Sequence, residues 1–78
     1  MSITYNGIMN KRALGLNIKA ERNRKDWSQD LLAEKANLSK TSVSLIENGN
    51  QTPSAFALYA IAKALNISID ELFKGVDD

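Results

Sequence analysis

The segment 39–45 gathers short polar side chains around a single lysine. Four of its residues carry hydroxyls, which both donate and accept hydrogen bonds, namely Ser39, Thr41, Ser42 and Ser44. Lys40 carries an ammonium group that can donate to guanine O6 and N7. Leu45, at the end of the segment, can pack on a thymine methyl group. The chemistry open to this stretch is therefore recognition of base edges, although an alternative is that Leu45 packs on a neighbouring helix or a second subunit.

The hydroxyls of the same segment have other interpretations. Ser42 and Ser44 could simply be small residues that fill a helix surface, and a phosphate contact is a better prediction for them than a base contact.

A second group of polar residues begins at Ser28, which is followed by Gln29 at the expected start of another helix. A helix N-terminus offers free N–H groups and a positive partial charge to an anion. We therefore expect Ser28 and Gln29 to meet phosphate, the alternative being an ordinary exposed glutamine.

Two short helices joined by a tight turn must position these groups. The first helix is predicted from Gln29 to Ala36, where Asn37 tolerates the left-handed conformation that ends a helix. Ser39 is a good N-cap for the second helix, which is predicted over about 39–48. Val43 and Ile46 repeat at helical spacing and should face inward, which leaves the polar residues between them facing outward. This arrangement is typical of a helix-turn-helix.

Three more helices are predicted around this pair. The first runs from Asn10 to Lys25, because Leu14, Ile18 and Arg22 recur at four-residue steps. Trp27 then precedes the next helix cap, where it is expected to pack as a hydrophobic staple. Stacking of Trp27 on a base is the weaker alternative.

The fourth helix is predicted to have Pro53 at its first position and to close at Asn66. Its apolar stripe includes Phe56 and Tyr59, and we expect both aromatic side chains in the core, together with Phe73. A capping box, which begins at Ser68, opens the fifth helix. The tail from Lys74 to Asp78 is expected to fray.

The composition fits a single all-α domain of 78 residues. We assign residues 1–9 to an N-terminal arm, 10–74 to a compact five-helix domain and 75–78 to a C-terminal tail. The sequence has no Cys and no His, which excludes a disulfide framework, a zinc finger and catalysis by a Cys or His side chain. No glycine-rich phosphate loop or paired carboxylates occur either. We therefore expect no enzyme, metal or cofactor.

The location of the protein is predicted from what the sequence lacks. No apolar run approaches the roughly 18 residues of a membrane span, and the first ten residues lack the layout of a signal peptide. A cytoplasmic protein without membrane association is expected.

Charge is distributed unevenly along the chain, although the net charge is only +1. Between Lys11 and Lys25 there are six basic residues against Glu21, whereas from Asp26 onward four lysines stand against eight acidic residues. The basic end could meet phosphate while the acidic end faces away. The alternative is a solvated helix face that happens to be rich in Lys and Arg.

Several motifs together resemble the Cro/lambda-repressor-type helix-turn-helix domain, which occurs in phage repressors, restriction-modification controller proteins and small bacterial regulators. The resemblance extends over about Leu14 to Phe73, roughly three quarters of the chain. The residues that carry it are Arg22, Trp27 to Gln29, Leu32-Ala33, Leu38-Ser39, Val43-Ser44, Ile46 to Gly49, Pro53 and Ala64 to Phe73.

The resemblance implies roles for particular residues. Gln29 would hold a phosphate, and Ser39, Lys40, Thr41 and Leu45 would approach base edges. Arg22 and Glu47 would form a structural pair that ties the first helix to the end of the third.

This sequence departs from the family pattern at two places. Asn37 stands where relatives often have Gly, and Asn tolerates the same conformation. The loop 50–52, which includes the candidate DNA contact Asn50, lacks the Lys or Arg that relatives often place against phosphate.

The expected function is sequence-specific binding of double-stranded DNA by a homodimeric transcriptional regulator, whose third helix reads the major groove. An antitoxin of a toxin–antitoxin pair and a helical protein-interaction module are the alternatives. For the dimer interface the sequence offers apolar residues near its C-terminus, with the N-terminal arm as a weaker candidate. These interface candidates are Ile67, Ile69, Leu72 and Phe73.

Overall fold

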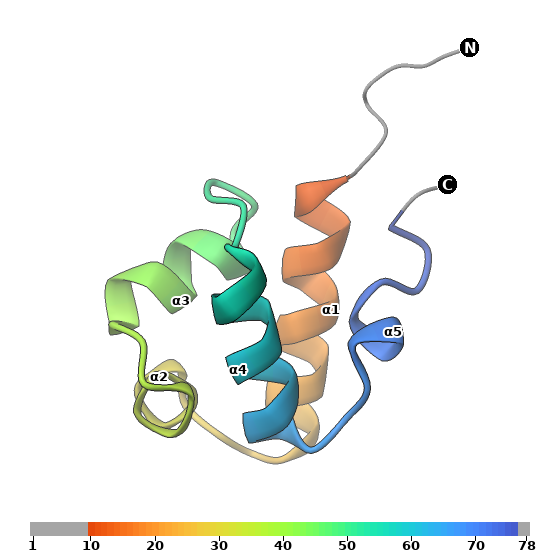
Figure 1. Ribbon diagram of the computed structural model, residues 1–78. Coiled ribbons are helices and arrows are strands. Elements are labelled where there is room, and N and C mark those ends of the chain that lie inside the picture. The colour runs from red at the N-terminus through yellow and green to blue at the C-terminus, as the bar shows by residue number, and fades with distance from the viewer. Residues whose placement is uncertain (1–9, 77–78) are drawn as a thin grey trace, which may run out of the picture.

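The computed structural model describes residues 10–76, which form five helices and no strand (Figure 1). The helices are α1 (Lys11–Arg24), α2 (Gln29–Ala36), α3 (Lys40–Glu47), α4 (Ala55–Leu65) and α5 (Ile69–Leu72). The all-α prediction with five helices is confirmed for this part of the chain. The predicted N-terminal arm, residues 1–9, lies outside the described residues, as do the last two residues of the predicted tail.

A polar side chain accepts a backbone hydrogen bond at the start of every helix described. Ser28 accepts from the N–H of Leu31 and Ser39 accepts from that of Ser42, both at 3.0 Å. The same geometry recurs at the starts of α1, α4 and α5, where the capping residues are Asn10, Ser54 and Ser68. Each cap satisfies one of the N–H groups that the first turn of a helix leaves free.

Residues in the left-handed conformation end four of the helices, and two of these helix ends, at Asn37 and Asn66, were predicted from the sequence. Asn37 and Asn66 have φ of 57° and 59°, and Gly49 has φ of 76°. At each of these ends the following N–H reaches back to a carbonyl in the last turn, for example Leu38 to Ala33 at 2.8 Å. Asp26, with φ of 59°, ends α1 in the same way and was not anticipated.

Helix α4 differs from its prediction in two respects. It begins at Ala55 with Ser54 as its cap, so Pro53 precedes the helix and is not its first residue. Phe56 and Tyr59 are exposed, with 88% and 58% of their surface accessible, so the expectation that they belong to the core was wrong. The buried face of α4 is formed by residues further along the helix, because that face packs against α2.

The core lies where α1, α2, α3 and α4 meet, and α5 packs on the outer side of α1 and α4 (Figure 1). Its fully buried large side chains are Leu14, Ile18, Leu32, Val43, Ile46, Ile61, Leu65, Leu72 and Val76. Val76 contradicts the expectation of a frayed tail, because its side chain is buried and its carbonyl accepts from the N–H of Asn10 at 3.2 Å. The amide of Asn17 also donates to the carbonyls of Leu72 and Lys74, which fixes this end of the chain on α1.

Gly15 allows α1 to pack directly against the backbone of α3. A Cβ atom at this position would lie 2.6 Å from the carbonyl oxygen of Glu47 and would also collide with the carbonyl oxygen of Ile46. Only a residue without a side chain permits this approach. The contact sets the position of the last turn of α3 relative to α1.

Candidate nucleic-acid interface

The turn between α2 and α3 fixes the orientation of both helices. Asn37 ends α2, and Ser39 caps α3 two residues later. Leu38, between them, packs against the core, and the buried Ala33 lies on the face of α2 that packs on its neighbours. Helix α3 is therefore held by its buried side chains, Val43 and Ile46, while the side chains on its opposite face are exposed or partly exposed.

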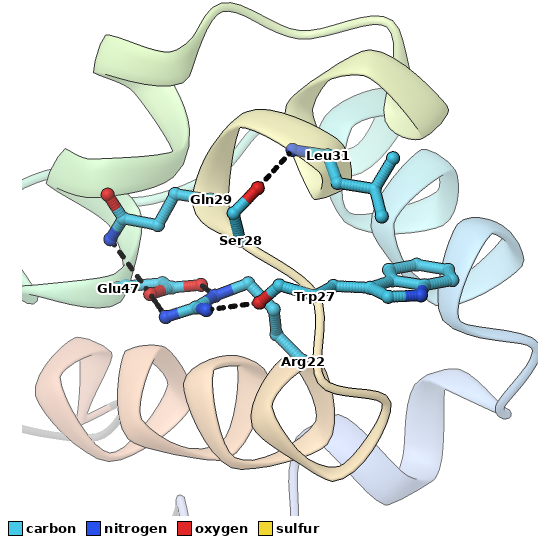
Figure 2. Close-up of polar contacts among 6 residues, drawn as sticks. All are labelled: Arg22, Trp27, Ser28, Gln29, Leu31 and Glu47. Atoms are coloured by element: carbon cyan, nitrogen blue, oxygen red, sulfur yellow. Dashed lines mark hydrogen bonds and ion pairs between the residues drawn. The ribbon is translucent and has the colours of Figure 1, made fainter.

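A buried ion pair joins α1 to the end of α3 (Figure 2). The guanidinium of Arg22 donates from Nε to Glu47 Oε2 at 2.7 Å and from Nη2 to Glu47 Oε1 at 3.0 Å. Gln29 Nε2 donates to the same Oε1 at 3.0 Å, so the carboxylate also holds the first residue of α2. The third guanidinium nitrogen, Nη1, donates to the carbonyl of Trp27 at 2.6 Å. The pairing of Arg22 with Glu47 that the family resemblance implies is present.

Each buried nitrogen and oxygen atom of this network has a hydrogen-bond partner. The Glu47 side chain is fully buried and that of Arg22 is only 10% exposed. The hydrogen bond to Glu47 raises the pKa of Arg22, an effect that desolvation opposes and the charge of Glu47 reinforces. Such a pair fixes geometry more than it adds stability, because burial of two charges costs about as much as their attraction returns. The hydrogen-bond network of Arg22, Gln29 and Glu47 therefore fixes the relative positions of α1, α2 and α3 near the start of α2.

The exposed face of α3 carries three of the four residues predicted to approach base edges, with Ser44, a predicted phosphate contact, beside them. Lys40 and Thr41 are exposed, and Ser44 and Leu45 are partly exposed. These four side chains line one shallow hollow on the surface. Lys40, Thr41 and Leu45 are therefore brought together on one face as predicted, and Leu45 is partly exposed there.

The remaining hydroxyls have structural partners. Ser39 accepts from the N–H of Ser42 and donates to the Ser42 hydroxyl at 3.0 Å. Ser28 likewise serves as the cap of α2. These three side chains thus lie near the helix starts, with the capping bonds already formed. Asn50 is exposed in the loop after α3, where its N–H donates to the carbonyl of Leu45 at 2.9 Å.

Asp30 belongs to this surface and was not anticipated from the sequence. Its carboxylate lies 3.9 Å from Lys40 Nζ, and both side chains are largely exposed. The two residues are ten apart in sequence and meet only because the turn brings the first turns of α2 and α3 together. Because Asp30 and Lys40 lie on different helices, no i,i+3 or i,i+4 spacing in the sequence could have predicted that they would meet.

Basic residues of α1 flank the other end of α3. Arg12 and Lys19 line a hollow with Leu16, Glu47 and Asn48. The buried Glu47 faces the network described above, so the accessible charges at this hollow are positive. Part of the predicted basic end of the chain therefore lies beside the C-terminal turn of α3.

Trp27 has a packing role. Its ring is partly buried against the core, and the ammonium groups of Lys25 and Lys35 lie 5.5 and 5.2 Å from the ring centre. This distance is typical of cation–π contacts. The predicted packing role is confirmed, because the ring is packed against the core.

Among residues 10–76, no three His, Cys, Asp or Glu side chains come together as a metal site would require. Nor does any helix in this range have the length and apolar character needed to cross a membrane. What the surface offers chemically is hydrogen bonding and positive charge on the exposed face of one helix and at its two ends.

A helix-turn-helix family model (HTH_3) matches residues 18–72, so this chain belongs to the helix-turn-helix family. The chain is similar to the competence pilus inhibition repressor of Acinetobacter baylyi, with 38% identity over 60 residues. It is also similar to the immunity repressor protein of Bacillus phage phi105, with 41% identity over 59 residues. These matches cover 77% and 76% of this chain but only 54% and 41% of the longer relatives.

The fold is also similar to that of solved structures. The restriction-modification controller protein C.AhdI from Aeromonas hydrophila superimposes with a TM-score of 0.79 at 30% identity. That match covers 81% of this chain and 96% of the controller protein. The resemblance to phage repressors and controller proteins is thereby confirmed at the level of the family.

Proposed function

We propose that this chain is a DNA-binding transcriptional regulator in which α3 reads base edges in the major groove and two copies bind together. Residues 10–74 form the DNA-binding unit, which acts in the cytoplasm, where DNA is accessible. The repressor relatives support the class of function. The observation that carries the proposal is the exposed polar face of α3 on a helix whose other face is fixed in the core.

The two kinds of DNA contact come from different residues. Lys40, Thr41, Ser44 and Leu45 lie together on the outer face of α3, where they would meet donors, acceptors and methyl groups in the groove. Phosphate contacts would come from the start of α2. Gln29 uses one amide N–H for Glu47, which leaves its second N–H for a phosphate oxygen.

Ser28, Ser39, Ser42 and Asn50 complete the proposed contact surface. The capping serines lie at the N-termini of α2 and α3, where partial positive charge favours an anion. Asn50 lies in the uncharged loop after α3. This surface contacts DNA with few cations, so the salt dependence of binding should be shallower than for strongly basic repressors.

Binding titrations with fluorescent duplexes test the proposal directly. The specific duplex is obtained by selection from a random pool, and the comparison duplex is random. Lys40→Ala should lower the preference for the specific duplex by about 1–3 kcal/mol through the loss of one base contact. Gln29→Ala should weaken binding to both duplexes alike, because phosphates carry no sequence information.

Lys63→Ala is the matched control, because Lys63 is an exposed lysine on α4 beside Tyr59. It should leave the preference unchanged. If Lys40→Ala lowers the affinity for both duplexes equally, Lys40 contacts phosphate and the proposed reading face is incorrect. If the unmodified protein binds neither duplex at low salt, the proposed function itself fails.

A further inference from the structure

A basic stripe, formed by Arg12, Leu16 and Lys19, runs along the first half of α1. Successive members are four and three residues apart, so they lie on one face of the helix. All three are exposed, and none of the four ion pairs found among residues 10–76 involves Arg12 or Lys19. The stripe therefore presents two positive charges about 10 Å apart along the helix axis.

The basic stripe borders the end of α3 and the loop that follows it. A Cβ atom on Gly49 would lie 2.9 Å from the Cα of Arg12, so the two backbones touch at this point. Arg12 and Lys19 share a surface hollow with Asn48, the residue that caps the end of α3. Figure 1 shows the start of α1 and this loop at the same end of the domain. The two cations therefore lie beside residues 50–52, which carry no charge.

The chemistry of this hollow suits the backbone of a nucleic acid. Its one carboxylate, among the residues that line it, belongs to Glu47, which is fully buried and paired with Arg22. The charges that a ligand can reach are thus the two cations of the basic stripe. Leu16 lies between them and is half-exposed. A cation, an apolar surface and a second cation match a backbone in which phosphates alternate with sugars.

Asn48 connects the basic stripe to the outer face of α3. Its backbone keeps the helical conformation, so it follows Thr41 and Ser44 at helical spacing on that face. The eight residues of α3 span about 12 Å, close to the width of the major groove, about 12 Å. When the start of α3 lies over base edges, its end therefore lies beside one of the phosphate strands that border the groove.

We propose that Arg12 and Lys19 bind a backbone phosphate of the DNA strand beside the C-terminal end of α3, where the loop 50–52 supplies no cation. This inference rests on the proposed function and adds a contact from outside the helix-turn-helix pair. The guanidinium of Arg12 can donate two parallel hydrogen bonds to one phosphate, while Lys19 adds a point charge. The start of α2 would hold the other strand, so α3 is fixed from both sides of the groove.

Salt titrations with a duplex that carries one selected half-site test this proposal. Each cation that contacts phosphate contributes about 0.9 to the slope of log affinity against log salt. Arg12→Gln and Lys19→Gln should each lower the slope by this amount, so each variant loses about 3.5-fold less affinity between 50 and 200 mM salt. The preference for the selected duplex should persist, because phosphates carry no sequence information. Both variants should keep the thermal midpoint, because both side chains are exposed.

Lys11→Gln is the matched control, because Lys11 is the exposed neighbour of Arg12 on α1 and does not line the hollow. It removes the same charge and should leave the salt slope nearly unchanged. An equal change of slope in Lys11→Gln and Arg12→Gln would show that only net charge matters, and would overturn the assignment of the basic stripe.

Replacement of single phosphates by uncharged methylphosphonates locates the contact. Neutralising the phosphate at the basic stripe should weaken binding of the unmodified protein but not of the double variant Arg12→Gln with Lys19→Gln. That phosphate should differ from the one whose effect Gln29→Ala removes. Equal sensitivity of the unmodified protein and the double variant at every phosphate would contradict this inference alone. If the unmodified protein binds no duplex, the proposed function fails with it.

Discussion

Glu47 shows how a single buried residue can set the geometry of the whole surface. Its carboxylate accepts hydrogen bonds from Arg22 on α1 and from Gln29 on α2, while the residue itself ends α3. Removal of one partner from such a pair leaves an uncompensated charge in the interior, which is more costly than removal of both. The network therefore couples the start of α2 to the end of α3.

Replacement of Arg22 tests that coupling. Arg22→Met should lower the free energy of unfolding by about 3–5 kcal/mol, because it leaves the fully buried carboxylate of Glu47 without its cation. The double replacement Arg22→Met with Glu47→Leu should cost much less. Urea denaturation measures both, and a double variant no more stable than the single one would contradict this account of the pair.

Asp30 should restrain DNA binding that is not sequence-specific. Its exposed carboxylate lies beside Lys40 and repels phosphates near the start of α2. Asp30→Asn should raise affinity for random DNA by about two- to fivefold at low salt, since exposed charge pairs contribute up to about 1 kcal/mol. The effect should vanish at high salt.

Glu34→Gln provides the comparison for Asp30→Asn, because it removes an exposed carboxylate nearer the C-terminus of α2. It should change the affinity for random DNA much less. An equal rise in both variants would show that only net charge matters, and that the position of Asp30 has no special effect.

At the scale of elements, Gly15 determines how closely α1 approaches α3. At an exposed position inside a helix, Gly→Ala usually raises the free energy of unfolding by about 1 kcal/mol, because Ala has the higher helix propensity. Here Gly15→Ala should instead destabilise the domain by about 1–3 kcal/mol, because the added Cβ collides with the carbonyls of Ile46 and Glu47. Thermal denaturation shows whether the Gly15→Ala variant is more or less stable than the unmodified protein. As a control, Ala20→Gly at an exposed position of the same helix should also destabilise the domain. A Gly15→Ala variant more stable than the unmodified protein would contradict the close packing.

The elements themselves could be predicted because their ends are local chemistry. Ser28, Ser39 and Ser68 cap helices as expected, and Asn37 ends α2 in the left-handed conformation that was predicted. The outward group on α3 was also predictable, because Val43 and Ile46 define the inward face by their spacing.

What could not be predicted depends on contacts between elements. Phe56 and Tyr59 have helical spacing typical of a core, yet the packing of α4 on α2 leaves them outside. Asp30 meets Lys40 only through the turn geometry. Val76 is buried because the chain returns along α1, a path that no local pattern encodes.

At the scale of the whole molecule, the proposed surface consists of one rigid reading helix flanked by phosphate contacts, and it is duplicated by pairing. The net charge of the whole chain, +1, supplies little general attraction to DNA. Specificity should therefore depend on the matched contacts of two copies more than on charge. Half-sites related by a two-fold axis are the direct consequence of such a pair.

Selection of bound sequences from a random duplex pool tests this central claim most directly, with the unmodified protein and Lys40→Ala run in parallel. We predict enrichment of two inverted half-sites whose centres lie about one helical turn apart. In Lys40→Ala the preference should be lost at one base in each half-site, symmetrically, while the other positions persist. Failure of the unmodified protein to enrich any sequence would contradict the claim that α3 reads DNA.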